Sequence, residues 1–329
     1  MEVVATASCA SLAFEKISGQ DPDVVTLDVN MPGLDGLGAL RCIMNQFPRP
    51  VIMVSATTEK EASTTLEALS AGAFDCVSKQ LSPASLEISH IRNELISKIR
   101  AAAQSRRNRL IAPECRKAPH SAPFKACNLA PAAPAIVAIG VSTGGPKALE
   151  QILPLFPSNF PIPILIVQHM PIGFTTPFAQ RLNSLSSIKV KEAAQGELIS
   201  PGTVYLAPAG LHMRVDPRQP DSNSAAIRLD KDPAGALHIP SVDVMMTSVA
   251  QVFRNRVIGV IMTGMGSDGS AGMSAIFRQG GLTIGQDEAS CAVYGMPRVC
   301  AQLGVLAHVS SLSDIPVQII NAARRRRRA

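Results

Sequence analysis

Short apolar runs that stop abruptly at polar residues dominate the C-terminal two thirds of the chain. Three such runs occupy residues 136–141, 164–167 and 257–262. Each has the length and the unbroken hydrophobicity of a strand buried on both faces of a parallel sheet. A segment with helical spacing follows the first run at residues 147–153. The pattern therefore predicts an α/β fold in which a doubly wound parallel sheet forms the larger domain.

The residues that follow these three runs carry chemically active side chains. They are Ser142, His169 and Asp268. In an open parallel sheet the carboxyl ends of the strands line the functional crevice, so we expect the three side chains at one edge. A hydroxyl to attack, an imidazole to take its proton and a carboxylate to orient the imidazole make up an acyl-transfer site. We predict that Ser142 is the nucleophile, His169 the base and Asp268 its partner.

Each of the three has a plainer interpretation. Ser142 lies in a Gly-rich turn that could bind a phosphate through backbone N–H groups, although no P-loop lysine and no GxGxxG motif are present. His169 could be a packed side chain, and Asp268 could cap a helix, since Gly269 follows it. Their like positions on like elements favour the catalytic interpretation.

The N-terminal third repeats the pattern with different chemistry. Apolar runs at residues 24–27, 51–54 and 73–78 end at Asp28, Ser55 and Lys79. A carboxylate can accept a phosphoryl group, a hydroxyl can bond it and a lysine can neutralise it. Ordinary strand ends are the alternative.

Composition changes between these two parts. Residues 86–103 have helical spacing, and residues 104–134 are rich in Ala, Pro and Arg, as in a flexible basic linker. We predict a first domain at residues 1–96, a linker at 97–133 and a catalytic domain at 134–329. The arginines at 324–328 form a basic tail, which is either solvated or a contact for an acidic surface.

Bulk properties restrict the class of protein. The chain has 329 residues, 46% of them hydrophobic, enough for two cores. Neither a membrane span nor a secretory leader is visible, so we expect a cytoplasmic protein without membrane insertion. Seven cysteines without a CxxC pair fit free thiols in a reducing compartment. The net charge of +6 comes mostly from the basic tail, and we expect no nucleic-acid partner.

Several motifs together carry a family resemblance. They are GVSTGGP, QHMP, LAPAG, PSVD, TGMGSDG and QDEASCAVYGMP, spread over residues 134–312. Together they resemble the chemotaxis protein-glutamate methylesterases of the CheB family, whose catalytic serine, histidine and aspartate match Ser142, His169 and Asp268. The resemblance implies hydrolysis of glutamyl methyl esters on methyl-accepting chemoreceptors, and deamidation of receptor glutamines, without a cofactor in catalysis. By position, we expect the N–H groups of Thr143 and Met265 to stabilise the oxyanion.

The segment LDVNMPGLDG resembles the receiver domain of response regulators, in an incomplete flavodoxin-like form. The resemblance implies that Asp28 is the phosphoacceptor, that Ser55 and Lys79 are the switch residues and that a chemotaxis histidine kinase is the phosphodonor. The opening EVVATA matches the second receiver strand, so the first strand and helix are missing, together with two carboxylates of the metal site. Asp28 alone remains, and we expect Mg²⁺-dependent phosphorylation only if a missing N-terminus exists. A misplaced start and a decayed domain both explain this.

Other interpretations stay open. A DNA-binding response regulator would show a basic helix-turn-helix, which is not visible. An inactive receptor-binding module would keep the motifs without the reaction. His212 is the second choice for a base or a groove residue, and Cys291 is a possible but weaker nucleophile.

Overall fold

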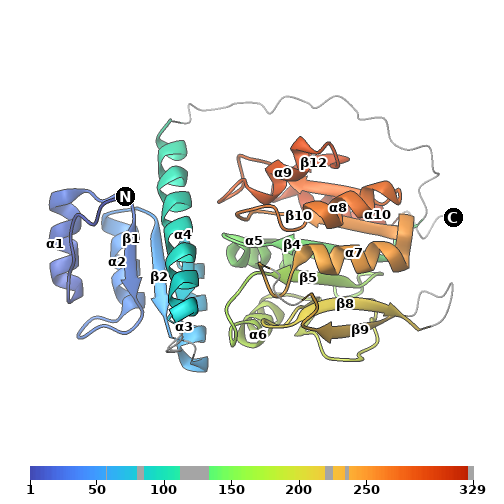
Figure 1. Cartoon of the computed structure of the whole chain (residues 1–329), viewed down its shortest axis with the longest axis horizontal. Coiled ribbons are helices and arrows are strands. Elements are labelled where there is room, and N and C mark those ends of the chain that lie inside the picture. Colours follow the sequence, from blue (N-terminus) through green and yellow to red (C-terminus); the bar gives the residue numbers. More distant parts are fainter. Residues whose placement is uncertain (57, 80–84, 112–132, 219–224, 234–236, 325–329) are drawn as a thin grey trace. The chain divides into compact units, whose positions relative to one another are not determined.

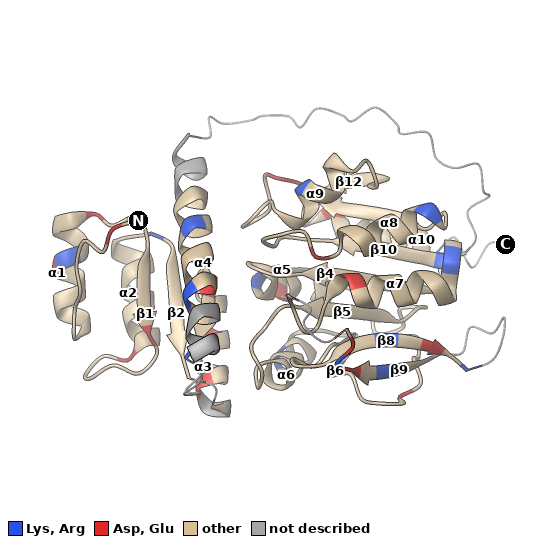
Figure 2. Ribbon diagram, in the orientation of Figure 1, with Lys and Arg blue, Asp and Glu red and all other residues tan. Residues whose placement is uncertain are grey.

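A computed structural model describes the chain except for residues 57, 80–84, 112–132, 219–224, 234–236 and 325–329 (Figure 1). It divides into two compact units, Met1–Ala118 and Pro119–Ala329. Both units are parallel sheets with helices, so the predicted α/β class is confirmed. Residues 112–132 of the predicted linker and residues 325–328 of the arginine tail lie outside the described residues. Figure 2 shows charges of both signs spread over the elements of each unit.

The second unit is built on a seven-stranded parallel sheet in the order β12-β11-β10-β4-β5-β7-β6. The strands are β4 Ile136–Val141, β5 Ile164–Gln168, β6 Lys189–Glu192, β7 Thr203–Leu206, β10 Val257–Ile261, β11 Leu282–Gln286 and β12 His308–Ser310. The helices are α5 Gly145–Ile152, α6 Thr175–Leu185, α7 Val242–Phe253, α8 Ser270–Arg278, α9 Met296–Gln302 and α10 Asp314–Arg324. A separate antiparallel pair comprises β8 His212–Pro217 and β9 Ala225–Asp230, and two 3₁₀ turns lie at Leu153–Leu155 and Arg254–Arg256. From the central β4 the chain proceeds to β5 on one side and later to β10 on the other, which makes β4 the switch point of the sheet.

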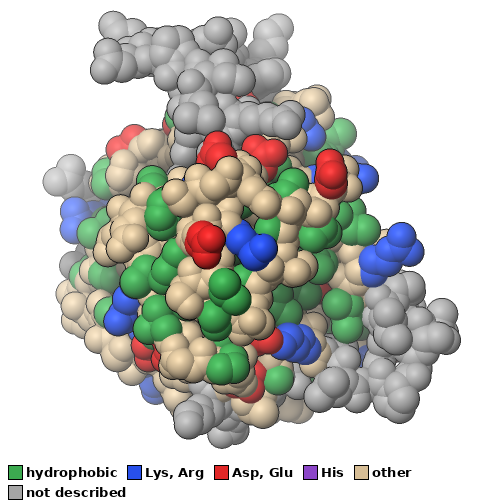
Figure 3. Space-filling view, turned by 90° about the vertical axis from the view of Figure 1, so that its left-hand side faces the viewer, with side chains coloured by type: hydrophobic (Ala, Val, Ile, Leu, Met, Phe, Trp, Pro, Cys, Tyr) green, Lys and Arg blue, Asp and Glu red, His purple; other side chains and the backbone are tan. Residues whose placement is uncertain are grey.

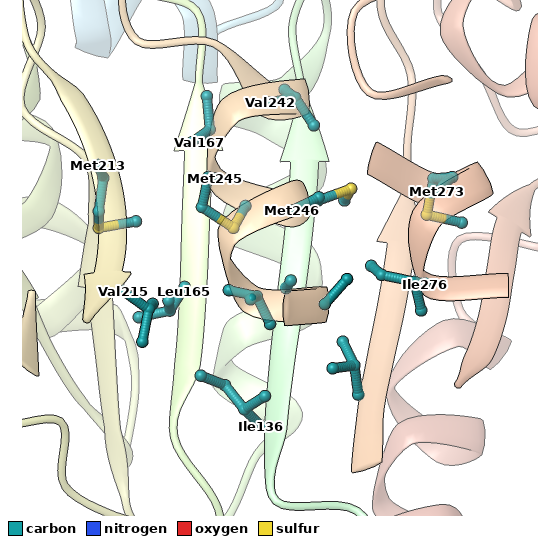
Figure 4. Packing of buried hydrophobic residues seen from close by; sticks show 14 of the residues in the cluster. Ile136, Leu165, Val167, Met213, Val215, Val242, Met245, Met246, Met273 and Ile276 are labelled. Atoms are coloured by element: carbon teal, nitrogen blue, oxygen red, sulfur yellow. The ribbon is translucent and has the colours of Figure 1, made fainter. Parts of the chain in front are cut away.

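The core of this unit lies where α7 and α8 pack on the centre of the sheet. Figure 4 shows side chains of β4, β5 and β8 meeting those of the two helices, with several methionines between them. All six residues of β4 are buried, as expected for a strand covered on both faces. Gly140 lets α7 approach, because a Cβ there would lie 2.2 Å from Val242 Cγ1. This close packing brings the start of α7 to the end of β4.

The first unit contains a smaller parallel sheet in the order β1-β2-β3. Its elements are α1 Ala10–Gln20, β1 Val25–Asp28, α2 Gly36–Gln46, β2 Val51–Ser55, α3 Glu59–Ser70, β3 Asp75–Ser78 and α4 Ser85–Ile111. On the side of the chain that carries α1, Figure 3 shows hydrophobic side chains among single acidic and basic ones.

The opening segment does not form the strand that its sequence predicts. Residues 1–7 have no regular structure, and the side chains of Val3 and Val4 are 78% and 51% exposed. A cavity of about 1200 Å³ is lined by this segment, α1, the edge of β1 and α4. Within the described residues β1 pairs only with β2, so its other edge is unpaired and the opening segment does not extend the sheet there.

Helix α4 extends to Ile111, beyond the helical spacing seen at residues 86–103. Residues 97–111, which the prediction assigned to the linker, are therefore helical. Alanines at 101–103 are strong helix formers, and Ala102 is fully buried. Lys98 bonds the carbonyl of Cys76 at 2.6 Å and pairs with Asp75 on β3 at 3.3 Å. Tertiary contacts therefore extend the helix past the point where apolar spacing fades.

Candidate active site

Three neighbouring strands, β10, β4 and β5, deliver the predicted catalytic residues to one edge of the large sheet. Val141 pairs with Gln168 in register, so Ser142 and His169 each follow a paired residue on adjacent strands. The Ser142 amide donates to the Thr263 carbonyl at 3.0 Å, and the His169 amide donates to the Val141 carbonyl at 3.2 Å. Because parallel strands lie about 4.8 Å apart, Ser142 and His169 begin their loops as neighbours.

His169 and Asp268 are joined directly. The Nε2 atom of His169 lies 2.8 Å from Oδ2 of Asp268, and each side chain is about 10% exposed. Burial opposes ionisation of this acid, but the hydrogen bond and charge interaction with His169 and two backbone donors outweigh burial and hold the pKa of Asp268 well below its usual range. Asp268 is therefore a carboxylate at neutral pH.

The remaining contacts of Asp268 come from the start of α7. Its Oδ1 accepts from Ser241 Oγ at 2.8 Å and from the Asp243 amide at 2.9 Å, and its Oδ2 accepts from the Val242 amide at 2.8 Å. The amides at a helix N-terminus favour an anion. Asp268 thus accepts hydrogen bonds from the N-terminus of α7 and from the imidazole. The alternative interpretation, a cap for the helix that follows Asp268, does not account for these contacts.

The tautomer of His169 follows from this geometry. A carboxylate only accepts hydrogen bonds, so Nε2 carries the proton and Nδ1 of the neutral ring is left as an acceptor. Nδ1 is buried and makes no hydrogen bond with the described residues. Among the described residues no hydrogen bond joins the side chains of Ser142 and His169. A contact of this kind often tightens only when substrate binds. Nδ1 is the ring atom available to a serine proton.

A tight turn after Ser142 and the loop after β10 surround this serine. The Gly145 amide donates to the Ser142 carbonyl at 2.8 Å, and Gly144, at φ +77°, is the N-cap of α5. Gly264 lies against Ser142, because a Cβ there would be 2.7 Å from Ser142 Cβ. The predicted oxyanion donors Thr143 and Met265 directly follow Ser142 and Gly264 in sequence, so their amides belong to the two backbones that meet here.

Sequence reasoning missed Gln168, the last residue of β5. Its buried amide group donates to the carbonyls of Ser142 at 3.0 Å and of His169 at 2.9 Å. One side chain therefore links the backbones of Ser142 and His169. A glutamine at the end of an otherwise apolar strand was the available signal, because a buried amide needs hydrogen-bond partners.

Two further histidines have roles that differ from those expected from the sequence. His212 begins β8, is fully buried and accepts from the Ser241 amide through Nδ1 at 3.1 Å. Burial lowers its pKa, so it supports the Ser241 segment as a neutral ring rather than acting as a base. His238, for which the sequence offered no partner, stacks on His169 with ring centroids 4.2 Å apart and planes at 19°. The only sequence signal for this role was that His238 lies three residues before Ser241, which belongs to the PSVD motif.

Cys291 does not have the chemistry of a nucleophile. Burial, followed by the negative charges of Asp287 and Glu288, raises the pKa of its thiol to about 12. A thiol with that pKa is protonated at neutral pH and is a poor nucleophile.

The second predicted group of residues also meets at the end of its sheet. Asp28, Ser55 and Lys79 end or follow β1, β2 and β3, and the Lys79 ammonium pairs with Oδ2 of Asp28. Glu61 of α3, which sequence reasoning missed, accepts from Ser55 Oγ at 3.3 Å and from Asn30 Nδ2 at 2.6 Å. Its carboxylate thus faces the same strand ends.

The groups around Asp28 do not fit a Mg²⁺ site. Magnesium requires near-octahedral oxygen ligands, several of them commonly carboxylates or waters. One oxygen of Asp28 binds an ammonium group, and Glu61 is engaged by Ser55 and Asn30. Across the part of the chain that the structure describes, no three His, Cys, Asp or Glu residues form a metal-binding group.

The helices of the described part of the chain include none long and apolar enough to cross a bilayer.

Two family models match this chain. A CheB methylesterase model matches residues 137–319, and a response regulator receiver domain model matches residues 1–90. The chain is 44% identical to protein-glutamate methylesterase/protein-glutamine glutaminase 2 of Nitratidesulfovibrio vulgaris, over 98% of this chain and 92% of that protein. A protein-glutamate methylesterase/protein-glutamine glutaminase of Pyrococcus abyssi is 43% identical over 98% and 86%. The crystal structure of the Thermotoga maritima CheB methylesterase catalytic domain is 39% identical, covers 58% of this chain and 99% of that one, and has a TM-score of 0.55.

Proposed function

The chain belongs to the CheB methylesterase family, and from this premise we propose that it removes methyl groups from glutamyl esters of chemoreceptors, and deamidates receptor glutamines, through Ser142, His169 and Asp268. The chain is a hydrolase of the protein-glutamate methylesterase and protein-glutamine glutaminase type, with a response-regulator domain, acting in chemotaxis. What is proposed is the set of side chains and the order of their actions.

In the first half-reaction Ser142 Oγ attacks the side-chain carbonyl carbon of the substrate. Nδ1 of His169 takes the hydroxyl proton, because Nε2 is already bonded to Asp268 at 2.8 Å. The imidazolium that forms is stabilised by the Asp268 carboxylate, which does not itself take the proton. The negative charge on the carbonyl oxygen falls next to the backbones of Thr143 and Met265 and the start of α5, where amide donors favour it.

The intermediate then collapses and His169 returns the proton to the leaving group, which completes acylation. An ester releases methanol and a primary amide releases ammonia, and both leave the same acyl-serine ester. Water then gives its proton to Nδ1, attacks the acyl carbon and expels Ser142, which regains the proton. One site serves both substrates, since they differ only in the leaving group.

The observation that carries this proposal is the orientation of His169. A buried ring with one nitrogen fixed on a carboxylate and the other nitrogen without a partner is a base awaiting a proton. Ser142 follows the neighbouring strand at the matching register position. The plainer interpretation, a packed histidine, provides no reason for the unpartnered buried nitrogen.

The family context supplies the partners. Chemoreceptors are the proposed substrates, and the receiver match at residues 1–90 implies a kinase as phosphodonor.

Methanol release from methyl-labelled receptor membranes tests the function. The full chain should release methanol, and Ser142→Ala should lower kcat by about 10⁶-fold, as loss of the nucleophile does in other serine hydrolases. Ser184→Ala, on the surface end of α6, is the matched control and should leave the rate unchanged. Substantial release by Ser142→Ala would rule out the assigned nucleophile, and no release by the full chain would favour an inactive receptor-binding module.

A further inference from the structure

The ring of His238 covers one face of the catalytic imidazole. The two ring centroids lie 4.2 Å apart and the planes differ by 19°, a parallel stack. The side chain of His169 is 10% exposed, so the stacked ring forms part of the small space around it. The mechanism above does not use this second histidine.

The segment that carries His238 is anchored to the same catalytic pair. Three residues later, Ser241 Oγ donates to Asp268 at 2.8 Å, and the Val242 amide donates to the other oxygen at 2.8 Å. The Ser241 amide is itself held by Nδ1 of the buried His212 at 3.1 Å. The position of the stacked ring is therefore set relative to Asp268 by the hydrogen bonds of Ser241 and Val242, three and four residues further along the chain.

A single hydrogen bond leaves the imidazole one important freedom. The bond from Nε2 to Asp268 fixes one edge of the ring, but the ring can still tilt about that bond. A proton moves well only when Nδ1 and its lone pair point at the serine oxygen, and a misplacement of about 1 Å can cost about 100-fold in rate. A flat side chain against the ring face opposes this tilt, because tilting would drive one ring into the other.

The stack also suits the charged form of the ring. An aromatic face attracts a cation placed over it, so the flat ring of His238 against His169 favours the imidazolium formed during each proton transfer. The same contact keeps water away from one face of that cation.

We propose that His238 is a positioning residue for the reaction: its ring stacks on His169, holds Nδ1 in the plane that faces Ser142 and supports the imidazolium formed there. This inference rests on the proposed function for its kinetic consequence. It does not require His238 to touch the substrate.

Four variants of the full chain separate stacking from mere space filling. His238→Phe keeps a flat ring, His238→Leu fills space without one, and His238→Ala removes both. His308→Ala, an exposed histidine of β12, is the control and should behave as wild type. We expect His238→Leu and His238→Ala to lower kcat for methanol release about tenfold with KM unchanged, less than the 100-fold of a full displacement. His238→Phe should stay within about threefold of wild type, because it restores the flat contact.

Two outcomes would overturn the proposal. One is a kcat for His238→Leu and His238→Ala equal to that of wild type, and the other is a His238→Phe variant as slow as His238→Leu. Should His238→Ala fail to fold, the comparison of Phe with Leu still decides, since both fill the site.

A second readout does not depend on substrate. The Nε2 proton shared by His169 and Asp268 should give a downfield NMR signal in wild type that exchanges faster with water in His238→Leu, and not in His238→Phe. Equal exchange in all variants contradicts the positioning role even if the chain proves to have another activity. If wild type releases no methanol but the NMR signal still differs among the variants, the result contradicts the proposed function and not the positioning role.

Discussion

Two strand-edge sites in this chain follow the same topological rule and differ in how their charged groups are held. In the catalytic unit, Asp268 is about 10% exposed and has four hydrogen-bond donors, including two amides at the start of α7. In the receiver unit the Asp28–Lys79 pair is 37% and 43% exposed, and β1 borders a cavity. A parallel sheet gathers side chains at its carboxyl edge, but burial and backbone donors fix their geometry and charge.

The difference has an energetic meaning. A buried carboxylate with several donors stays ionised and oriented, and removing a partner leaves an uncompensated group in a place that water does not reach. An exposed ion pair is solvated whether it forms or not, so its net stabilisation is small. The comparison predicts large effects of substitution at the first site and small effects at the second.

The largest effect is expected at Asp268. Asp268→Asn keeps the shape of the side chain but removes the charge, and its amide group can donate a hydrogen bond to Nε2, which favours the tautomer with the proton on Nδ1. By analogy with the same substitution in other triads, kcat for methanol release should fall by about 10⁴-fold.

Asp243→Asn is the matched control for that variant. Asp243 is also an acid at the start of α7, but its Oδ1 accepts from the Gly272 amide at 2.7 Å and no described hydrogen bond joins it to His169. The kcat of the Asp243→Asn variant should stay close to that of wild type. Equal losses in the two variants would mean that a general weakening of the α7–α8 contact, rather than the tautomer, explains the effect.

A smaller loss is expected when the backbone beside the nucleophile is displaced. In Gly264→Ala the added Cβ would lie 2.7 Å from Ser142 Cβ and 2.3 Å from Met296 Sδ, so the loop or the serine must move. A shift approaching 1 Å should lower kcat about 100-fold. Gly266→Ala, in the same loop with open space around the new atom, should retain much more activity despite its φ of +86°. A Gly264→Ala enzyme as fast as Gly266→Ala would show that this loop does not set the position of Ser142.

Much of this arrangement was predictable because the signals are local. The apolar runs located β4, β5 and β10 to within about one residue at their ends, and parallel topology then placed Ser142, His169 and Asp268 on adjacent strands. Burial of both faces makes such strands uniformly apolar, so the first polar residue marks the sheet edge.

What the sequence did not reveal depends on long-range contacts. His238 reaches His169 only because the segment before α7 returns to the end of β5, and no periodicity encodes that path. The extension of α4 depends on Lys98 meeting β3, and the opening segment stays irregular although β1 leaves one edge unpaired within the described residues. Such features arise from packing between elements that are distant in the chain, after each element has formed.

The smallest expected effect tests the receiver half of the comparison. Lys79→Met removes an ion pair whose side chains are 43% and 37% exposed, and such pairs contribute at most about 1 kcal/mol. Lys98→Met removes an ammonium that is 13% exposed and bonds Asp75, Glu94 and the Cys76 carbonyl. Burial opposes the Lys98 charge, but Asp75 and Glu94 outweigh burial and raise its pKa, so its loss should cost several times more, about 3–5 kcal/mol. Amide hydrogen exchange of β3 in the full chain measures both variants, and a Lys79→Met effect as large as that of Lys98→Met would mean that exposure does not separate the two kinds of ion pair.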